Sequence, residues 1–147
     1  MKLVRIPTSY IDDVWNLIKK DIQEALSYSG NHTDSDFVLE TLKQEKFQLW
    51  IVWDKNQKTT LDKYYGVVVT EIVQRKLKRS CNIFIVTGRQ RQKWQHLIKN
   101  LEDFASKNKC DQMELFARKG WEKIMEQFNY KKTHVVLEKQ IEKKENE

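Results

Sequence analysis

The stretch Ile83–Trp94, IFIVTGRQRQKW, changes character at its single glycine. The residues before Gly88 are mostly branched or aromatic, which is typical of a buried strand. After Gly88 come arginine, glutamine and lysine, and the apolar residues then recur every three or four positions, which indicates one face of a helix. That face consists of Trp94, Leu97, Ile98, Leu101 and Phe104. The stretch therefore predicts a strand that passes through a short turn into a helix ending near Asn108.

Two segments upstream resemble strands and pair naturally with this one. FQLWIVWD, Phe47–Asp54, and YYGVVVTEIV, residues 64–73, are rich in aromatic and β-branched residues. The polar stretch DKNQKTTLDK joins the first to the second, and the basic turn QRKLKR joins the second to SCNIFIVTG, residues 80–88. Three consecutive strands with such connections favour antiparallel pairing.

The N-terminal part predicts a strand followed by two helices. Lys2–Ile6 alternates apolar and polar residues and stops at Pro7. A helical face then runs to a predicted end near Gly30, and a shorter helix carries Phe37 and Leu42. The face of the first helix consists of Ile11, Val14, Trp15, Ile18, Ile22, Ala25 and Leu26. Ser9 with Asp12, and Thr33 with Asp36, have the spacing of capping boxes for the two helices.

The C-terminal part alternates strand and helix. Gln112–Ala117 is a predicted strand, residues 121–128 a short helix, and Thr133–Lys139 a last strand. The step from strand through helix to strand that follows the three consecutive strands favours a parallel crossover. The sequence thus predicts an α/β fold, with a mixed, mainly antiparallel sheet of six to seven strands flanked by about four helices. It forms one domain over residues 1–141, followed by a charged tail at 142–147.

Composition narrows the class of protein. The 147 residues are 39% hydrophobic and 33% charged, with a net charge of +6, which favours anionic partners. No run approaches the ~20 apolar residues of a membrane span, so no membrane partner and a cytoplasmic location are expected. Cys81 and Cys110 are isolated, which fits a reduced compartment, and His32, His96 and His134 have no metal-ligand spacing. No metal site is predicted, and a Cys-His nucleophile pair lacks an orienting third residue.

The element order at this length resembles the GNAT superfamily of acyl-CoA N-acyltransferases over Met1–Ile141. The chain is also similar to short GNAT-like proteins of tailed phages around LWIVWD, GVVVTEI, GRQRQKW, RKGWEK and YKKTHVVLEK. The resemblance implies acetyl-CoA as cofactor and an amine as acceptor. The phage likeness implies a virion component or a host-directed factor, located in the host cytoplasm or the virion.

In that family the fourth strand leads into a turn of pattern [Q/R]-x-x-G-x-[G/A], whose amides hold the pyrophosphate of coenzyme A. Aligning Leu97 and Ile98 with the family's leucine pair places this motif on Arg89, Gln92 and Trp94, so arginine is kept and both small positions are lost. Side chains at Gln92 and Trp94 are expected to crowd the pyrophosphate. Trp94 is better explained as a core anchor than as a cofactor contact, and the basic residues are better explained as a solvated helix start. The cofactor-binding candidates are Val86, Gly88, Arg89, Arg91, Gln92 and Lys93.

The resemblance also implies a carboxylate on the middle strands and a tyrosine acid on the last helix. SCNIFIVTG has no carboxylate, so Glu71 is the nearest candidate base, although it could instead pair with Arg75 or Lys78. Met125 stands at the tyrosine position and Asn129 at a glycine position. Tyr130 and Tyr28 are possible substitutes for the acid, although half-buried packing is the more common role of a tyrosine next to a strand.

Two further readings concern binding. The basic turn, with the arginines after Gly88 at the same end of the sheet, could contact nucleic-acid phosphates, but a solvated basic face is favoured. Ser27–Asp36 lies where the family's acceptor loop would be, and also fits a plain polar linker. The sequence therefore favours a divergent GNAT-like protein with weak or lost acetyl transfer and a binding or assembly role through a protein partner or homo-oligomer. The alternative is an active acetyl-CoA-dependent N-acetyltransferase that acts on an amine of a small molecule or protein.

Overall fold

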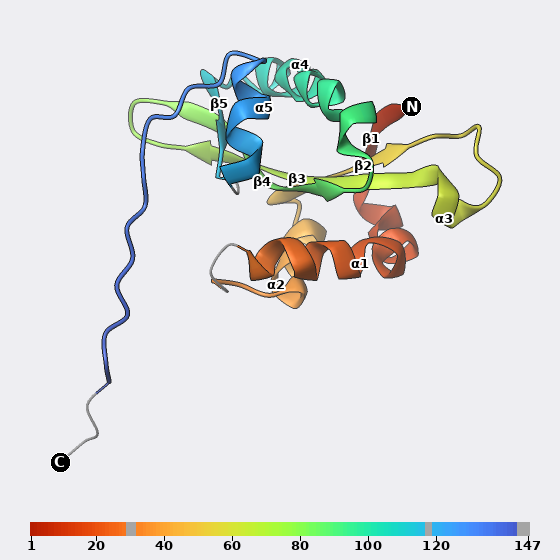
Figure 1. The fold of residues 1–147 in the computed structure, drawn as a ribbon, viewed down its shortest axis with the longest axis horizontal. Helices are drawn as coiled ribbons and strands as arrows, with labels where there is room; N and C mark the ends of the chain where they lie inside the picture. Colours follow the sequence, from red (N-terminus) through yellow and green to blue (C-terminus); the bar gives the residue numbers. More distant parts are fainter. Residues whose placement is uncertain (29–31, 117–118, 144–147) are drawn as a thin grey trace.

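The computed structural model describes residues 1–28, 32–116 and 119–143, which form one sheet with helices on both faces (Figure 1). The strands are β1 Lys2–Ile6, β2 Phe47–Trp53, β3 Tyr64–Gln74, β4 Arg79–Gly88 and β5 Gln112–Leu115. The α-helices are α1 Ile11–Ser27, α2 Ser35–Lys43, α3 Thr60–Lys63, α4 Asn100–Lys107 and α5 Glu122–Glu126. Short 3₁₀ helices are η1 Thr8–Tyr10, η2 Arg91–Lys93, η3 Gln95–Lys99 and η4 Lys119–Trp121.

The sheet has the strand order β1-β2-β3-β4-β5. The pairs from β1 to β4 are antiparallel, and β4 pairs with β5 in parallel, so the predicted hairpins and crossover are confirmed. The connection from β2 to β3 also contains α3, which sequence periodicity did not reveal. The fold is a mixed, mostly antiparallel α/β sheet.

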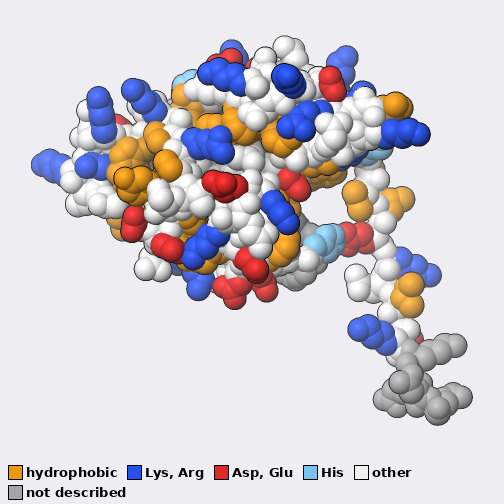
Figure 2. Space-filling view, turned by 180° about the vertical axis from the view of Figure 1, so that it is seen from behind, with side chains coloured by type: hydrophobic (Ala, Val, Ile, Leu, Met, Phe, Trp, Pro, Cys, Tyr) orange, Lys and Arg blue, Asp and Glu red, His pale blue; other side chains and the backbone are white. Residues whose placement is uncertain are grey.

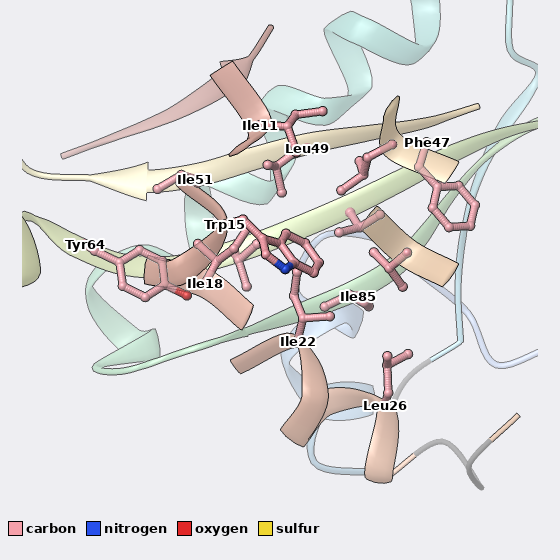
Figure 3. Close-up of a cluster of buried hydrophobic side chains, with 14 residues drawn as sticks. Ile11, Trp15, Ile18, Ile22, Leu26, Phe47, Leu49, Ile51, Tyr64 and Ile85 are labelled. Carbon is pink, nitrogen blue, oxygen red and sulfur yellow. The ribbon is translucent and has the colours of Figure 1, made fainter. Parts of the chain in front are cut away.

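Helices α1 and α2 cover one face of the sheet. Ile11, Trp15, Ile18, Ile22 and Leu26 recur along one side of α1 and are all buried, so the predicted apolar face is confirmed (Figure 3). They pack against alternate residues of β2 and β3, because successive side chains of a strand point to opposite faces. Burial of each large side chain contributes roughly 1.5–3 kcal/mol.

Helices α4 and α5 cover the opposite face (Figure 1). Trp94, Ile98 and Leu101 are buried there together with Trp121 and Met125. The expected helix after Trp94 is present, but its first part is the 3₁₀ helix η3 and only residues from Asn100 onward are α-helical. The predicted final short helix is confirmed as η4 and α5.

Both capping predictions were wrong in detail. Ser9 lies inside η1, and α1 begins after Tyr10 without a side-chain cap. At α2 the cap is Asp34, whose carboxylate accepts a hydrogen bond from the backbone N–H of Phe37 at 2.9 Å. A polar residue caps the N-terminus of a helix only where its own backbone is extended rather than helical, and Asp34 meets that condition. The predicted helix end near Gly30 lies outside the described residues.

The predicted last strand, Thr133–Lys139, is absent, and the described sheet has five strands rather than six or seven. The described residues 131–143 run on from the domain as an extended segment (Figure 1). Its β-branched residues favour a strand, but a strand forms only beside a partner edge. The segment makes no backbone hydrogen bond with the rest of the described chain, which explains the difference.

Candidate functional site

The turn after β4 is fixed to the neighbouring strand by backbone contacts. A Cβ atom at Gly88 would lie 2.2 Å from the carbonyl oxygen of Tyr65 and 2.5 Å from the Cα of Gly66. The backbone N–H of Arg89 donates to the same Tyr65 oxygen at 2.8 Å. Only glycine allows this approach, so Gly88 is required for the chain to leave β4 against β3.

The turn leaves three consecutive amides available. Gln90 adopts the left-handed conformation, with φ 50° and ψ 46°, and η2 follows it directly. The backbone N–H groups of Gln90, Arg91 and Gln92 find no acceptor among the described residues, whereas those of Lys93 and Trp94 close the 3₁₀ turn. A left-handed residue followed by a right-handed turn points successive N–H groups into one concavity, which favours an anion.

The basic side chains at this turn have different roles. Arg89 donates from Nε to the Tyr64 carbonyl at 3.1 Å and from an Nη to the Asp62 carbonyl at 2.7 Å. Its guanidinium also lies 4.0 Å from the centre of the Tyr65 ring. Arg89 is therefore held against the β2–β3 connection, where its main effect is to position the turn.

Arg91 packs on an aromatic ring beside the turn. Its guanidinium carbon lies 5.1 Å from the centre of the Trp121 ring, and its Nε is buried without a hydrogen-bond partner. A buried donor without a partner is costly. The side chains of Gln92 and Lys93 are exposed beside it.

Trp94 is a core anchor. Its side chain is 0% exposed, and its indole N–H donates to the Arg89 carbonyl at 2.8 Å. A Cβ atom at Gly66 on β3 would lie 2.9 Å from Trp94 Cζ2, so the absence of a side chain at Gly66 makes room for the indole. The family motif has a small residue at the position of Trp94, whereas in this chain the small residue is Gly66 on the facing strand β3. Val86 is likewise buried in this core.

An unpaired strand edge leads to the turn. The pairing of β4 with β5 ends at Ile83 and Leu115, and β4 continues for five more residues, Phe84–Gly88. The register with β3 shifts at the same point, where Val69 faces Ile85 and Thr70 faces Ile83, so Phe84 is an extra residue in β4. Such a bulge bends a strand and disrupts its ladder. Among the described residues, the edge of β4 that faces away from β3 therefore has no strand partner from Phe84 to the turn.

Glu71 lies on β3, beside the end of β4 that is far from the turn. It is in register with Asn82 of β4 and Phe47 of β2, which places its side chain on the face covered by α1 and α2. Burial raises the pKa of Glu71, and nearby Arg75 lowers it by a smaller amount. The expected ion pair with Arg75 is not formed, because Arg75 bonds both carboxylate oxygens of Glu114.

Tyr130 lies on the opposite face. It packs in the core under α4 and α5, and its buried hydroxyl has no hydrogen-bond partner. Burial raises the pKa of Tyr130, and the negative charges of Glu102 and Cys81 raise it further. Asn129 before it adopts φ 69°, a left-handed conformation that asparagine tolerates better than most residues, so it replaces the family's glycine conformationally. The alternative, Tyr28, is largely exposed.

The two candidate catalytic groups are thus separated from each other and from the turn. Glu71 and Tyr130 lie on opposite faces of the sheet, beside Asn82 and Cys81 respectively. Cys81 and Gly88 are seven positions apart along β4, which corresponds to about 23 Å. The fold does not bring these two groups and the turn together into one catalytic site.

The basic clusters were predicted to lie at one end of the sheet, and this was wrong. Arg79 begins β4 and Gly88 ends it, so the turn 75–79 and the turn 88–93 lie at opposite ends of the strand, about 30 Å apart. Arg75 and Arg79 also have partners, namely Glu114 and the Asn108 carbonyl. A continuous basic face for nucleic acid is therefore not formed by these residues.

Other chemistry finds little support in the described residues. Both cysteines are free, and burial raises the pKa of Cys81 to about 12, so its thiol is not an activated nucleophile. The described residues contain no cluster of three or more side chains able to hold a metal ion. No helix in the described part of the chain has the length and apolar character to cross a membrane. Two hollows of about 400 and 550 Å³ lie away from the turn, and Glu71 borders the larger one.

The mostly antiparallel sheet, in which β5 pairs with β4 in parallel and helices cover both faces, is a GNAT-like fold. Solved structures share it over nearly their whole length. A "probable acetyltransferase" is 12% identical with a TM-score of 0.70, covering 99% of this chain and 100% of its own. An aminoglycoside acetyltransferase, meta-AAC0020, from an uncultured soil metagenomic sample, in complex with sisomicin, is 16% identical with a TM-score of 0.64, covering 96% of both chains.

A "predicted acetyltransferase" from Clostridium acetobutylicum, determined with acetyl-CoA, is 13% identical with a TM-score of 0.64, covering 95% of both chains. No protein-family model and no curated protein sequence matches the chain. At these identities the likeness establishes the fold, and the expected GNAT-like fold is confirmed. The similarity to phage proteins stays a prediction.

Proposed function

We propose that this chain binds acyl-CoA at the turn Gly88–Lys93 and that its acetyl transfer is weak or absent. The observation that carries the proposal is the set of three unbonded amides that follows the left-handed Gln90 at the end of β4. Backbone N–H groups at a turn that starts a helix favour phosphate oxygens, and the Arg91 guanidinium adds a full positive charge. A solved structure of the same fold carries acetyl-CoA.

The unpaired edge of β4 suits the rest of the cofactor. The pantetheine arm of coenzyme A contains two amide groups, and the free edge from Phe84 to Gly88 offers backbone donors and acceptors next to the turn. An extended ligand that carries amides can add to such an edge as a strand would. The pyrophosphate at the amides of Gln90–Gln92 and the arm along β4 would then form one continuous site.

The acid-base groups support the second half of the proposal. Acetyl transfer to an amine requires that the amine lose a proton and that the departing thiolate gain one. Met125 cannot donate a proton at the family's tyrosine position, and Tyr130 is buried with a raised pKa. Glu71 lies on the opposite face, so Glu71 and Tyr130 are not placed to perform the two proton transfers together.

The binding test is isothermal titration calorimetry with acetyl-CoA. We expect saturable binding, weakened at least fivefold by Arg91→Ala. Lys99→Ala is the matched control, because it removes the same charge from an exposed residue of η3, and it should change the affinity less than twofold. Absence of any heat at millimolar acetyl-CoA would overturn the cofactor assignment.

The chemistry test is the release of free coenzyme A, separated by liquid chromatography, with small-molecule and peptide amines as acceptors. We expect release no faster than acetyl-CoA hydrolysis without protein. The alternative function is an active N-acetyltransferase, for which the raised pKa of Glu71 is the supporting observation, since a base should titrate near neutral pH. Amine-dependent release that Glu71→Gln abolishes would establish that alternative.

A further inference from the structure

The segment that follows the last helix carries exposed apolar side chains. Figure 2 shows them along the extended chain that stands away from the body of the domain. Val135, Val136, Leu137 and Ile141 are between 65% and 89% exposed, although they lie within seven consecutive residues. Single exposed apolar residues are common, but a cluster of aliphatic side chains in one short extended segment indicates an interaction site.

The contacts of this segment in the described chain are few and polar. Lys132 lies 3.9 Å from Glu122, and Glu138 lies 3.3 Å from His32. Neither ion pair buries the aliphatic side chains. Because the segment has no backbone hydrogen bond to the described chain, its N–H and C=O groups are available to a strand.

The same chain presents the complementary surface. Strand β5 is the last strand of the sheet, and of the described strands it pairs only with β4, along one edge. Its apolar residues Met113 and Leu115 are half-buried and extend the core under α4 and α5 to this free edge. An uncovered edge next to an apolar face favours the addition of a strand.

We propose that residues 133–141 pair with the β5 edge of a second copy of this chain, and that the two copies exchange these segments reciprocally. A two-fold arrangement covers both β5 edges and both apolar segments at once, so the assembly closes at two chains. Each chain supplies one β5 edge and one segment 133–141, so a pair of chains leaves neither an edge nor a segment over.

Pairing with the β5 edge of the same chain is disfavoured by the position of Tyr130. The N–H of Tyr130 donates to Met125 at 3.1 Å, and its side chain is close to Cys81, which is in register with Met113 near the start of β5. A segment that starts beside the first residues of β5 could pair with β5 of its own chain only in parallel. Parallel pairing is less stable per residue than antiparallel pairing. Antiparallel pairing would first require Lys131 and Lys132 to span the strand and turn back.

The oligomeric state is tested by light scattering coupled to size exclusion. The wild-type chain, of 17.8 kDa, should elute with twice that mass at 50 µM. Leu137→Lys should convert it to the monomer. Leu77→Lys is the matched control, because Leu77 in the β3–β4 turn is also 89% exposed, and this variant should remain dimeric. A monomeric wild-type protein, or an equal effect of both substitutions, would overturn the proposal.

Cross-linking distinguishes exchange from other dimers. In a Cys110→Ser background, one preparation carries Met113→Cys and the other Val136→Cys; the two are mixed, unfolded, refolded together and treated with a flexible bismaleimide at pH 7. Cys81 stays unreactive because burial raises its pKa to about 12. Exchange predicts a cross-linked pair that contains one chain of each kind. Cross-linking within single chains of a Met113→Cys, Val136→Cys double variant, without a mixed pair, would show own-edge pairing and overturn the proposal.

Discussion

Replacement of Trp94 by phenylalanine tests whether this residue anchors the core or contacts the cofactor. The change removes the hydrogen bond from the indole N–H to the Arg89 carbonyl, worth about 0.5–1.5 kcal/mol. It also removes two buried ring carbons, worth roughly 1.5 kcal/mol in transfer free energy. The free energy of unfolding should therefore fall by about 2–3 kcal/mol, which corresponds to a fall in Tm of roughly 5–10 °C for a chain of this size.

Urea unfolding followed by far-ultraviolet circular dichroism measures this loss without depending on tryptophan fluorescence. Trp53→Phe is the control. Because Trp53 is only half-buried, this substitution should lower the free energy of unfolding by less than about 1.5 kcal/mol. The acetyl-CoA affinity of the folded Trp94→Phe variant should stay within threefold of wild type, since the indole lies inside the core. A loss of stability below about 0.5 kcal/mol, combined with a large loss of affinity, would refute the anchor and restore the cofactor contact.

Three further outcomes follow from the same contacts. Gly66→Ala should lower the free energy of unfolding by about 1–3 kcal/mol in urea, because its Cβ would lie 2.9 Å from both the Thr87 carbonyl oxygen and Trp94; a neutral effect would contradict the packing. The raised pKa of Glu71 means that the folded state binds its proton more tightly, so stability falls as the pH rises from 4.5 through the folded value; Glu71→Gln should be more stable than wild type at pH 7 and equal to it at pH 4. A thiol reagent at pH 7 should modify Cys110 and leave Cys81 unmodified in the native protein, and modification of both without unfolding would contradict the burial of Cys81.

The periodic elements of this fold could be predicted from the sequence. The strand β1 and the helix α1 with its three- and four-residue apolar repeat were both confirmed. The predicted alternation in β1 was not, because Leu3 packs in the core under α4 and α5 and Ile6 in the core under α1 and α2. The missing last strand depends on a partner edge that periodicity cannot reveal. The cap of α2 was misplaced by one residue because Thr33 and Asp34 are equally suitable by residue type, and backbone conformation selects between them.

Predictions about the site failed where they required distances between elements. Gly66 and Trp94 are 28 positions apart, and only the packing of the Trp94 indole against β3 shows that one makes room for the other. The two basic turns appear similar in the sequence, but the ten residues of β4 place them at opposite ends of a strand. The free amides at Gln90–Gln92 depend on a left-handed glutamine, which its residue type does not indicate, since glycine and asparagine are the usual occupants.

Acetyl-CoA binding without acetyl transfer is tested by titration of acetyl-CoA into the wild-type, Arg91→Ala and Lys99→Ala proteins, with coenzyme A release followed in the same samples after an amine is added. We expect saturable binding, a loss of affinity confined to Arg91→Ala, and no amine-dependent release. Binding that is unchanged in Arg91→Ala, or rapid release of coenzyme A on addition of the amine, would contradict the proposal.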